Sequence, residues 1–186
     1  SAAALLLRQQ GYQCDGAMLR LYSGEVEGTC CSADDAADAR SVAYGLGMKF
    51  YVFNEGPRFA ADVMDHFVSE YCAGRTPNPC IDCNRYLKFE RLYHRAKELD
   101  CDYIATGHYA RIDTLPNGRL AIRNSVTAAK DQTYALYALT QEQLAHTLMP
   151  VGDYTKDQIR AIALENHIPV ANKPDSQEIC FVPDQD

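Results

Sequence analysis

The alternation of short strand-like segments with longer helix-like segments is the feature that most constrains the fold of this chain. Apolar runs over residues 16–21, 49–53 and 102–106 are typical of short strands. Segments with helical periodicity separate these runs, which is the pattern of βαβ units. The sequence therefore predicts an α/β fold, in which a parallel sheet is flanked by helices.

The helical segments have clear beginnings and ends. Gly11, Gly47 and Gly74 each follow such a segment, as glycine often does at a helix C-terminus. Ser32 occupies an N-cap position and acidic residues follow it, where the helix dipole favours negative charge. We expect helices over residues 1–10, 32–46, 59–72 and 84–98, and two shorter helices that begin at Thr140 and Thr155.

A hairpin is predicted over residues 110–124. Pro116-Asn117-Gly118 lies near its centre and is a strong turn signal between two strand-like runs. Together with the two short helices that follow, the hairpin predicts a small helical and hairpin second lobe.

Composition and charge exclude some classes of protein. The chain is 47% hydrophobic and 23% charged, as in ordinary globular domains, and it lacks the run of about 18 apolar residues that a membrane span needs. We therefore expect no membrane partner.

The net charge of −7 does not favour nucleic acid as a partner. Residues 75–97 nevertheless hold more cations than acids, which indicates either a local phosphate-binding face or a helix face of mixed charges.

The eight cysteines do not indicate a secreted disulfide scaffold, because the chain also has long helical patterns and a large apolar fraction. Cys14, Cys72 and Cys101 lie in apolar-periodic segments and are expected to be core thiols. A reducing cytoplasm is the compartment that fits best.

Two cysteine sites lie in polar, turn-forming stretches. Cys80 and Cys83 form a CxxC after Pro77-Asn78-Pro79, and Cys180 follows a polar segment. Such thiols can meet only through the fold, for sulfur chemistry, a metal or cluster, or a disulfide. Structural zinc normally needs four ligands, and no second CxxC is present. Cys83 is a candidate nucleophile, because a helix start and nearby arginines favour the thiolate form. Cys180 is either a second functional thiol or a cysteine that lies in a loop by chance.

Two further segments could contact a ligand. Gly107-His108 follows a predicted strand, and parallel sheets bind ligands beyond the C-terminal ends of their strands. Lys130-Asp131-Gln132 precedes an apolar run, so that it is either a ligand contact or an ordinary helix start. Neither segment identifies a reaction by itself.

Taken together, these segments resemble the tRNA-specific 2-thiouridylases of the PP-loop ATP pyrophosphatase superfamily. The resemblance covers nearly the whole chain in the family order. It implies an adenine nucleotide alpha hydrolase-like, Rossmann-like fold. The segments that carry it are Cys30-Cys31-Ser32-Ala33-Asp34-Asp35, Gly74-Arg75-Thr76-Pro77-Asn78-Pro79-Cys80, Cys83-Asn84-Arg85, Ala105-Thr106-Gly107-His108-Tyr109-Ala110-Arg111, Lys130-Asp131-Gln132-Thr133-Tyr134 and Asp175-Ser176-Gln177-Glu178-Ile179-Cys180-Phe181.

The resemblance implies a tRNA sulfurtransferase that makes 2-thiouridine. ATP, with Mg²⁺, would adenylate O2 of the wobble uridine of a tRNA, and a sulfur delivered by a donor protein would replace that oxygen. Cys180 falls at the persulfide position and Cys83 at the second catalytic cysteine, which could end in a disulfide with Cys180. A competing proposal for the family makes Cys80, Cys83 and Cys180 ligands of a [4Fe-4S] cluster.

The resemblance also implies contacts with ATP and tRNA. Leu19 and Gly107 fall at ATP-contacting positions. The positions that contact the target base or the tRNA are Asn78, Pro79, Cys80, His108, Lys130, Asp131 and Gln132. A base inside a stack must be flipped out before it can react.

We expect the chain to be a fragment, because Ser1 opens what reads as a buried helix without its preceding strand and loop. The family's phosphate loop would precede Ser1 and further domains would follow Asp186, so that the chain alone should be inactive. Residues 1–138, with the cysteine loop at 75–84, are assigned to the nucleotide-binding domain, and 139–186 to the start of a tRNA-binding linker. The alternatives are a non-catalytic metal-binding or tRNA-docking module, or another PP-loop adenylating enzyme.

Overall fold

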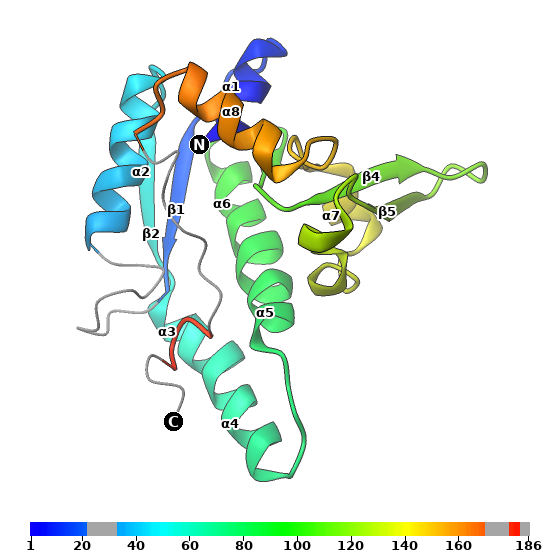
Figure 1. Ribbon diagram of the computed structural model, residues 1–186. Helices are drawn as coiled ribbons and strands as arrows, with labels where there is room; N and C mark the ends of the chain where they lie inside the picture. The colour runs from blue at the N-terminus through cyan, green and yellow to red at the C-terminus, as the bar shows by residue number, and fades with distance from the viewer. Residues whose placement is uncertain (22–32, 170–178, 183–186) are drawn as a thin grey trace.

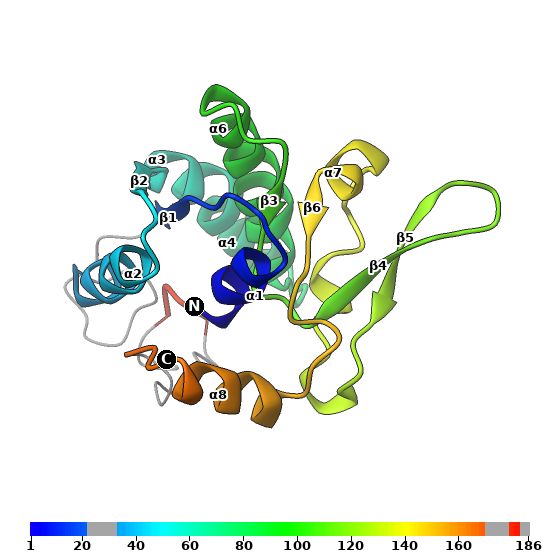
Figure 2. The ribbon, with the colours of Figure 1, turned by 90° about the horizontal axis from the view of Figure 1, so that it is seen from above.

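A computed structural model describes residues 1–21, 33–169 and 179–182 of the chain (Figure 1). Parallel strands flanked by helices confirm the predicted α/β class. Figures 1 and 2 both show α2 (Ala33–Gly45) along one side of the strand pair β1–β2, and the β4–β5 hairpin projecting on the opposite side of the molecule. The predicted N-cap Ser32 lies outside the described residues.

The strands form three separate pairs in the described part of the chain. β1 (Gly16–Arg20) runs parallel to β2 (Phe50–Asn54), and β3 (Ile104–Ala105) runs parallel to β6 (Thr147–Leu148). β4 (Ala110–Thr114) and β5 (Leu120–Asn124) form the predicted antiparallel hairpin. The third predicted strand is thus shorter than expected, because its partner β6 offers only two residues for pairing.

Two long helical runs lie in the described part of the chain. The first consists of α3 (Gly56–Phe59), the π-helical segment η1 (Ala60–Met64) and α4 (Asp65–Cys72). The second consists of α5 (Pro79–Asp82), the π-helical segment η2 (Cys83–Arg91) and α6 (Leu92–Glu98). Val63 of the first and Leu87 of the second are fully buried in one hydrophobic cluster, so that the two runs pack against each other.

The second helical run begins five residues earlier than the sequence predicted. The Asn78 side chain accepts a hydrogen bond from the backbone N–H of Cys80 at 3.0 Å, which caps the helix. Pro79 occupies the first turn, where its fixed φ favours the helix and no N–H is needed. Both thiols of the CxxC therefore lie within the helix.

The shorter helices are as expected. α1 (Ala2–Gln9) ends before Gly11, and α7 (Gln141–Ala145) and α8 (Lys156–Glu165) follow Thr140 and Thr155. Both threonines form capping boxes, in which the side-chain oxygens of Gln143 and Gln158 accept a hydrogen bond from the threonine backbone N–H. Two 3₁₀ turns, η3 (Ala128–Lys130) and η4 (Thr133–Ala135), connect the hairpin to α7.

Gly152 lies tightly against the first residue of the hairpin. A Cβ atom at this position would come 1.9 Å from the carbonyl oxygen of Ala110, far inside a normal contact. The Gly152 carbonyl also accepts a hydrogen bond from the backbone N–H of Val126 at 3.2 Å. Close backbone packing at this glycine therefore joins the hairpin to the segment before α8.

The expected core thiols are only partly confirmed. Cys14 and Cys101 are half-buried, and burial raises the pKa of both thiols. The expectation for Cys72 is wrong, because this thiol is exposed at the end of α4, a helix that buries none of its residues. None of the helices in the described ranges is long and apolar enough to cross a membrane.

Candidate functional site

Cys83 and Cys180 lie at the same hydrophobic cluster in the fold. Cys83 is 9% exposed and belongs to a buried group that we call the thiol cluster: Leu21, Phe59, Val63, Cys83 and Leu87. Cys180 packs against this cluster, together with its neighbour Phe181. No disulfide joins any two of the six cysteines that the structure describes.

Aromatic contacts hold the segment that carries Cys180. The Phe181 ring lies 5.6 Å from the Phe59 ring and 5.5 Å from the Phe67 ring, both in edge-to-face geometry. A hydrogen bond of 2.9 Å from the backbone N–H of Val182 to the carbonyl of Ile179 closes a turn around the cysteine. In Figure 1 this short red segment lies beside α3.

The helix start that carries Cys83 is held by polar contacts. Asp82, directly before Cys83, bonds through its carboxylate to the Nδ1 atom of His66 at 2.8 Å. The same imidazole lies 3.9 Å from Glu70, whose carboxylate forms two hydrogen bonds with Arg75. These bonds hold the pKa of Glu70 below its usual range. The predicted cation Arg75 is thus already paired with an acid.

The three proposed cluster ligands differ in their surroundings. Cys83 is buried and Cys180 is half-buried, whereas Cys80 is exposed one turn earlier on the helix and lies outside the thiol cluster. Within the described residues, no three potential metal ligands of the His, Cys, Asp and Glu types come together. This arrangement does not fit a cluster held by three thiolates.

Asn84 belongs to a segment that carries the family resemblance, but the sequence assigned it no role of its own. Its side chain is 3% exposed, and its amide oxygen Oδ1 has no hydrogen-bond partner in the part of the chain that the structure describes. Leaving a buried acceptor unpaired costs about 1–3 kcal/mol. This acceptor belongs to the residue directly after Cys83 in the sequence.

A cavity of about 990 Å³ lies among α1, α2, α6 and the strands β1, β2 and β3. The Gly107 backbone lines it, and a Cβ atom added there would meet no atom within 4 Å. Leu19 does not line the cavity and packs instead against the thiol cluster. Of the two predicted ATP contacts, Gly107 alone therefore belongs to this cavity.

His108, the next residue, is buried. Its ring is 8% exposed and lies 5.7 Å from the Phe89 ring, and its Nδ1 atom is 2.8 Å from the Thr106 hydroxyl. Burial, with a smaller effect of nearby Lys88, lowers the pKa of His108 to about 3. The imidazole is therefore neutral at physiological pH and can take part in hydrogen bonds but not in charge pairing with a phosphate.

The Lys130-Asp131-Gln132 segment forms a loop fixed by its own side chains. Asp131 accepts hydrogen bonds from the backbone N–H groups of Ser125 and Thr133, at 2.8 and 3.1 Å. Burial opposes ionisation of this carboxyl, but these bonds and one from the Thr133 hydroxyl lower its pKa overall. Gln132 exchanges two hydrogen bonds with the backbone of Tyr109, both at 3.0 Å. Asp131 and Gln132 thus shape the loop that presents Lys130.

The predicted basic face over residues 75–97 is largely neutralised by ion pairs. Arg91 and Arg95 both reach the carboxylate of Glu55, which is 3% exposed, and Lys97 pairs with Glu142 at 3.2 Å. Arg85 and Lys88 are different, because neither has an acidic partner within ion-pair distance among the described residues. The mixed-charge interpretation therefore describes most of this helix.

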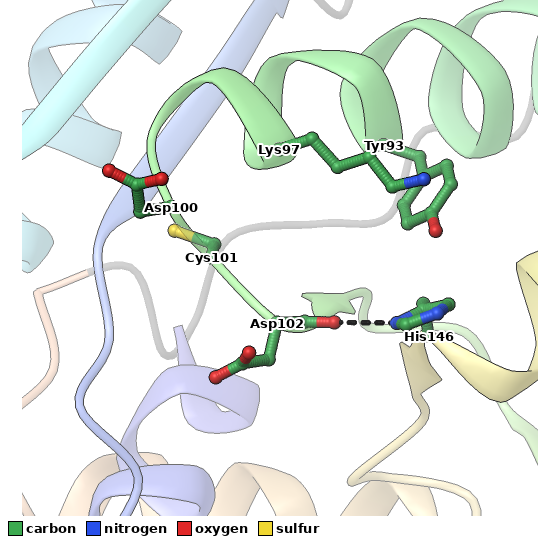
Figure 3. Close-up of a pocket in the computed structure, with 6 residues that line it drawn as sticks. All are labelled: Tyr93, Lys97, Asp100, Cys101, Asp102 and His146. Carbon is green, nitrogen blue, oxygen red and sulfur yellow. Dashed lines mark hydrogen bonds between the residues drawn. The ribbon is translucent and has the colours of Figure 1, made fainter.

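A second hollow, of about 400 Å³, lies between the end of α6 and the residue after α7. Figure 3 shows that the side chains of Asp100 and Asp102 point away from the His146 imidazole, which instead bonds to the Asp102 carbonyl at 2.9 Å. Cys101 also lies apart from the imidazole in this view. These groups do not converge on one point, so the hollow does not form a reactive site.

The chain matches a known protein family along almost its whole length. The profile of the family described as "tRNA methyl transferase HUP domain" matches residues 1–184. A tRNA-specific 2-thiouridylase MnmA of Lachnoclostridium phytofermentans is 58% identical over 99% of the chain, and proteins of the same name from Clostridioides difficile and Clostridium acetobutylicum are 53% and 52% identical over the whole chain. The chain spans 53–54% of the length of these relatives.

Proposed function

This chain belongs to the tRNA methyl transferase HUP domain family, and from this we infer that it carries the thiol site of a tRNA-uridine 2-sulfurtransferase. The observation that supports the inference most strongly is the packing of Cys180 against the buried cluster that contains Cys83. The 2-thiouridylase names of relatives at 52–58% identity support the same activity.

The proposed sulfur transfer uses both thiols. Cys180 accepts a sulfur atom from a donor protein as a persulfide, and the outer sulfur attacks C2 of the activated uridine. The Cys83 thiolate then attacks the inner sulfur, which belongs to Cys180. The sulfur–sulfur bond of the persulfide breaks, its electron pair goes to the transferred sulfur, and a Cys83–Cys180 disulfide forms. A cellular thiol reductant restores the two thiols after each cycle.

ATP supplies the leaving group in this proposal, because adenylation of O2 turns the oxygen into part of AMP. The open backbone at Gly107 beside the 990 Å³ cavity suits a nucleotide, which can approach closely where no side chain projects. Mg²⁺ would accompany the ATP phosphates. Leu19 packs against the thiol cluster, so that any contact of this residue with ATP would be made from that side.

The tRNA is proposed to approach from the capped helix start. Asn78 and Cys80 are exposed there and Pro79 is buried beneath them, so that the exposed pair can contact a flipped base next to Cys83. Lys130 would contact the tRNA backbone from the loop that Asp131 and Gln132 fix, and residues 139–186 would extend that surface. A neutral His108 would contribute only hydrogen bonds. A cytoplasmic location fits both the tRNA substrate and the need for reduced thiols.

Substitution of single thiols in the intact protein tests the proposal. We expect Cys83→Ser and Cys180→Ser to lower 2-thiouridine formation by a factor of about 10³ or more, because each removes a bond-forming sulfur. Cys72→Ser is the matched control, since Cys72 is exposed on α4 outside the thiol cluster. Mass spectrometry of the modified tRNA measures the product. Normal product from either of the first two variants contradicts the proposed role of that thiol.

The [4Fe-4S] alternative predicts a different result at Cys80. Loss of activity in Cys80→Ser, with iron and sulfide in anaerobically purified protein, would favour a cluster over the persulfide. Activity of Cys80→Ser in colourless protein would favour the persulfide, as the exposure of Cys80 does. Retained tRNA binding with no dependence of product on any thiol would instead favour a docking module.

A further inference from the structure

We propose that α4 is a positioning helix, which sets the approach of Cys180 to Cys83 through two consecutive residues, His66 and Phe67. The inference rests on the proposed exchange between these thiols and adds to it two residues that contact the segments on which the thiols lie. It explains how two segments that are far apart in the sequence keep a fixed spacing.

The His66 contact fixes the helix start that carries Cys83. The Nδ1 atom of His66 lies 2.8 Å from the Asp82 carboxylate, and only 16% of the Asp82 side chain is exposed. Glu70, one turn further along α4, lies 3.9 Å from the other ring nitrogen and is itself held by Arg75. The imidazole is thus oriented from both sides, and Asp82 is adjacent in sequence to Cys83.

The Phe67 contact fixes the segment that carries Cys180. The ring centres of Phe67 and Phe181 are 5.5 Å apart and the ring planes are nearly perpendicular, at 83°. Edge-to-face aromatic pairs have preferred geometry, so this contact restrains the direction of the Phe181 ring. Because Phe181 follows Cys180 directly, the restraint extends to the second thiol.

The position of α4 in the molecule supports a positioning function. None of its eight residues is buried, so the helix contributes little to the hydrophobic core. Consecutive residues on an α-helix point about 100° apart, which allows His66 and Phe67 to contact two different segments. Val68, the next residue, is 56% exposed and offers a neutral control.

The test measures how fast Cys83 and Cys180 form a disulfide when the intact, reduced protein is treated with diamide. Peptide mass spectrometry would follow this bond among the other thiols. We expect His66→Ala and Phe67→Ala each to slow closure by about tenfold or more, because small displacements of reacting groups lower rates steeply. Val68→Ala should close at the wild-type rate. His66→Gln can still donate a hydrogen bond to Asp82 and should recover most of the lost rate.

Two further measurements separate positioning from general damage to the fold. Alkylation of exposed Cys80 should proceed at the same rate in all variants, and urea unfolding should show that each variant is folded. If Phe67→Ala is unfolded, Phe67→Leu replaces it, since leucine keeps apolar volume but loses the ring contact. Wild-type closure rates in the folded His66 and Phe67 variants would overturn the inference.

The inference and the proposed function can fail separately. The proposed function fails if Cys83→Ser or Cys180→Ser still forms 2-thiouridine normally, whatever the closure rates are. The positioning inference fails if closure is insensitive to His66 and Phe67, even where both thiols prove essential.

Discussion

The thiol cluster and the cavity beside Gly107 are built in opposite ways. The cluster is filled by side chains, and its members Phe59, Val63 and Leu87 are at most 1% exposed. The cavity is a hollow of about 990 Å³ between the strand pair β1–β2 and the strand β3. Side chains in the cluster are therefore tightly packed, whereas residues that line the hollow face open space, and substitutions in the two regions should have different effects.

The largest expected effect distinguishes the two regions by stability. Leu87→Ala in the thiol cluster should lower the free energy of unfolding by about 2–5 kcal/mol, because it leaves a cavity in a packed group. Leu99→Ala at the wall of the large cavity should cost less than about 1 kcal/mol, because that side chain is 36% exposed. Urea unfolding of both variants measures the difference. Equal losses would contradict the comparison.

The second prediction uses a matched pair of glycines. Gly152→Ala should destabilise the protein by about 1–3 kcal/mol, since the new methyl group would overlap the Ala110 carbonyl. Gly107→Ala should leave the free energy of unfolding unchanged within about 0.5 kcal/mol, because its Cβ would meet open space. If ATP occupies the cavity, Gly107→Ala should weaken ATP binding, which calorimetry on the intact protein would measure. A destabilised Gly107→Ala variant would show that this wall is packed after all.

The third prediction concerns acid sensitivity. The pKa of His108 is about 3 in the folded protein and 6.5 as its ordinary value, so below pH 6.5 the unfolded chain binds a proton that the folded protein does not. Above pH 6.5, His108 therefore does not make the free energy of unfolding depend on pH. As the pH decreases from 6.5 towards 3, the free energy of unfolding falls by up to about 1.4 kcal/mol per pH unit because of this residue.

Replacement of His108 isolates this contribution from the carboxylates that titrate in the same range. His108→Gln should have a shallower loss of stability between pH 6.5 and 5 than the wild type. Urea unfolding at a series of pH values measures the slope. Parallel curves for the two proteins would show that burial does not suppress protonation of this imidazole.

The smallest expected effect lies beside Cys83. Asn84→Leu should leave the free energy of unfolding unchanged or raise it by about 1 kcal/mol, because it replaces a buried acceptor that has no described partner. The same variant should lower 2-thiouridine formation in the intact protein if Asn84 accepts a hydrogen bond from the target base. A destabilised variant with normal activity would show that the amide serves the fold and not the site.

Features that depend on local chemistry were predictable from the sequence. Thr140 and Thr155 cap their helices as expected, and the turn at Pro116-Asn117-Gly118 lies in the predicted hairpin. The α/β class followed from the alternation of strand and helix patterns. The family resemblance predicts that Cys83 and Cys180 act together; the structure places both residues at one cluster, and their roles stay a prediction.

Features that depend on distant partners were not predictable. β6 has only two residues, too few to show a periodicity, and becomes a strand only because β3 lies beside it. The basic residues Arg91 and Arg95 give no local sign that the buried carboxylate of Glu55 neutralises them. Cys72 follows an apolar pattern, yet α4 lies at the surface with none of its residues buried, and the thiol is exposed.

The helical run from Pro79 to Glu98 connects the two regions that were compared above. Its first turns carry Cys80 and Cys83, and its last turns, at Leu92 and Ala96, form part of the cavity wall. One residue inserted midway would advance one end by roughly 1.5 Å and rotate it by roughly 100° relative to the other. The number of residues between Cys83 and the cavity wall therefore sets both the distance and the angle between the thiol cluster and the cavity.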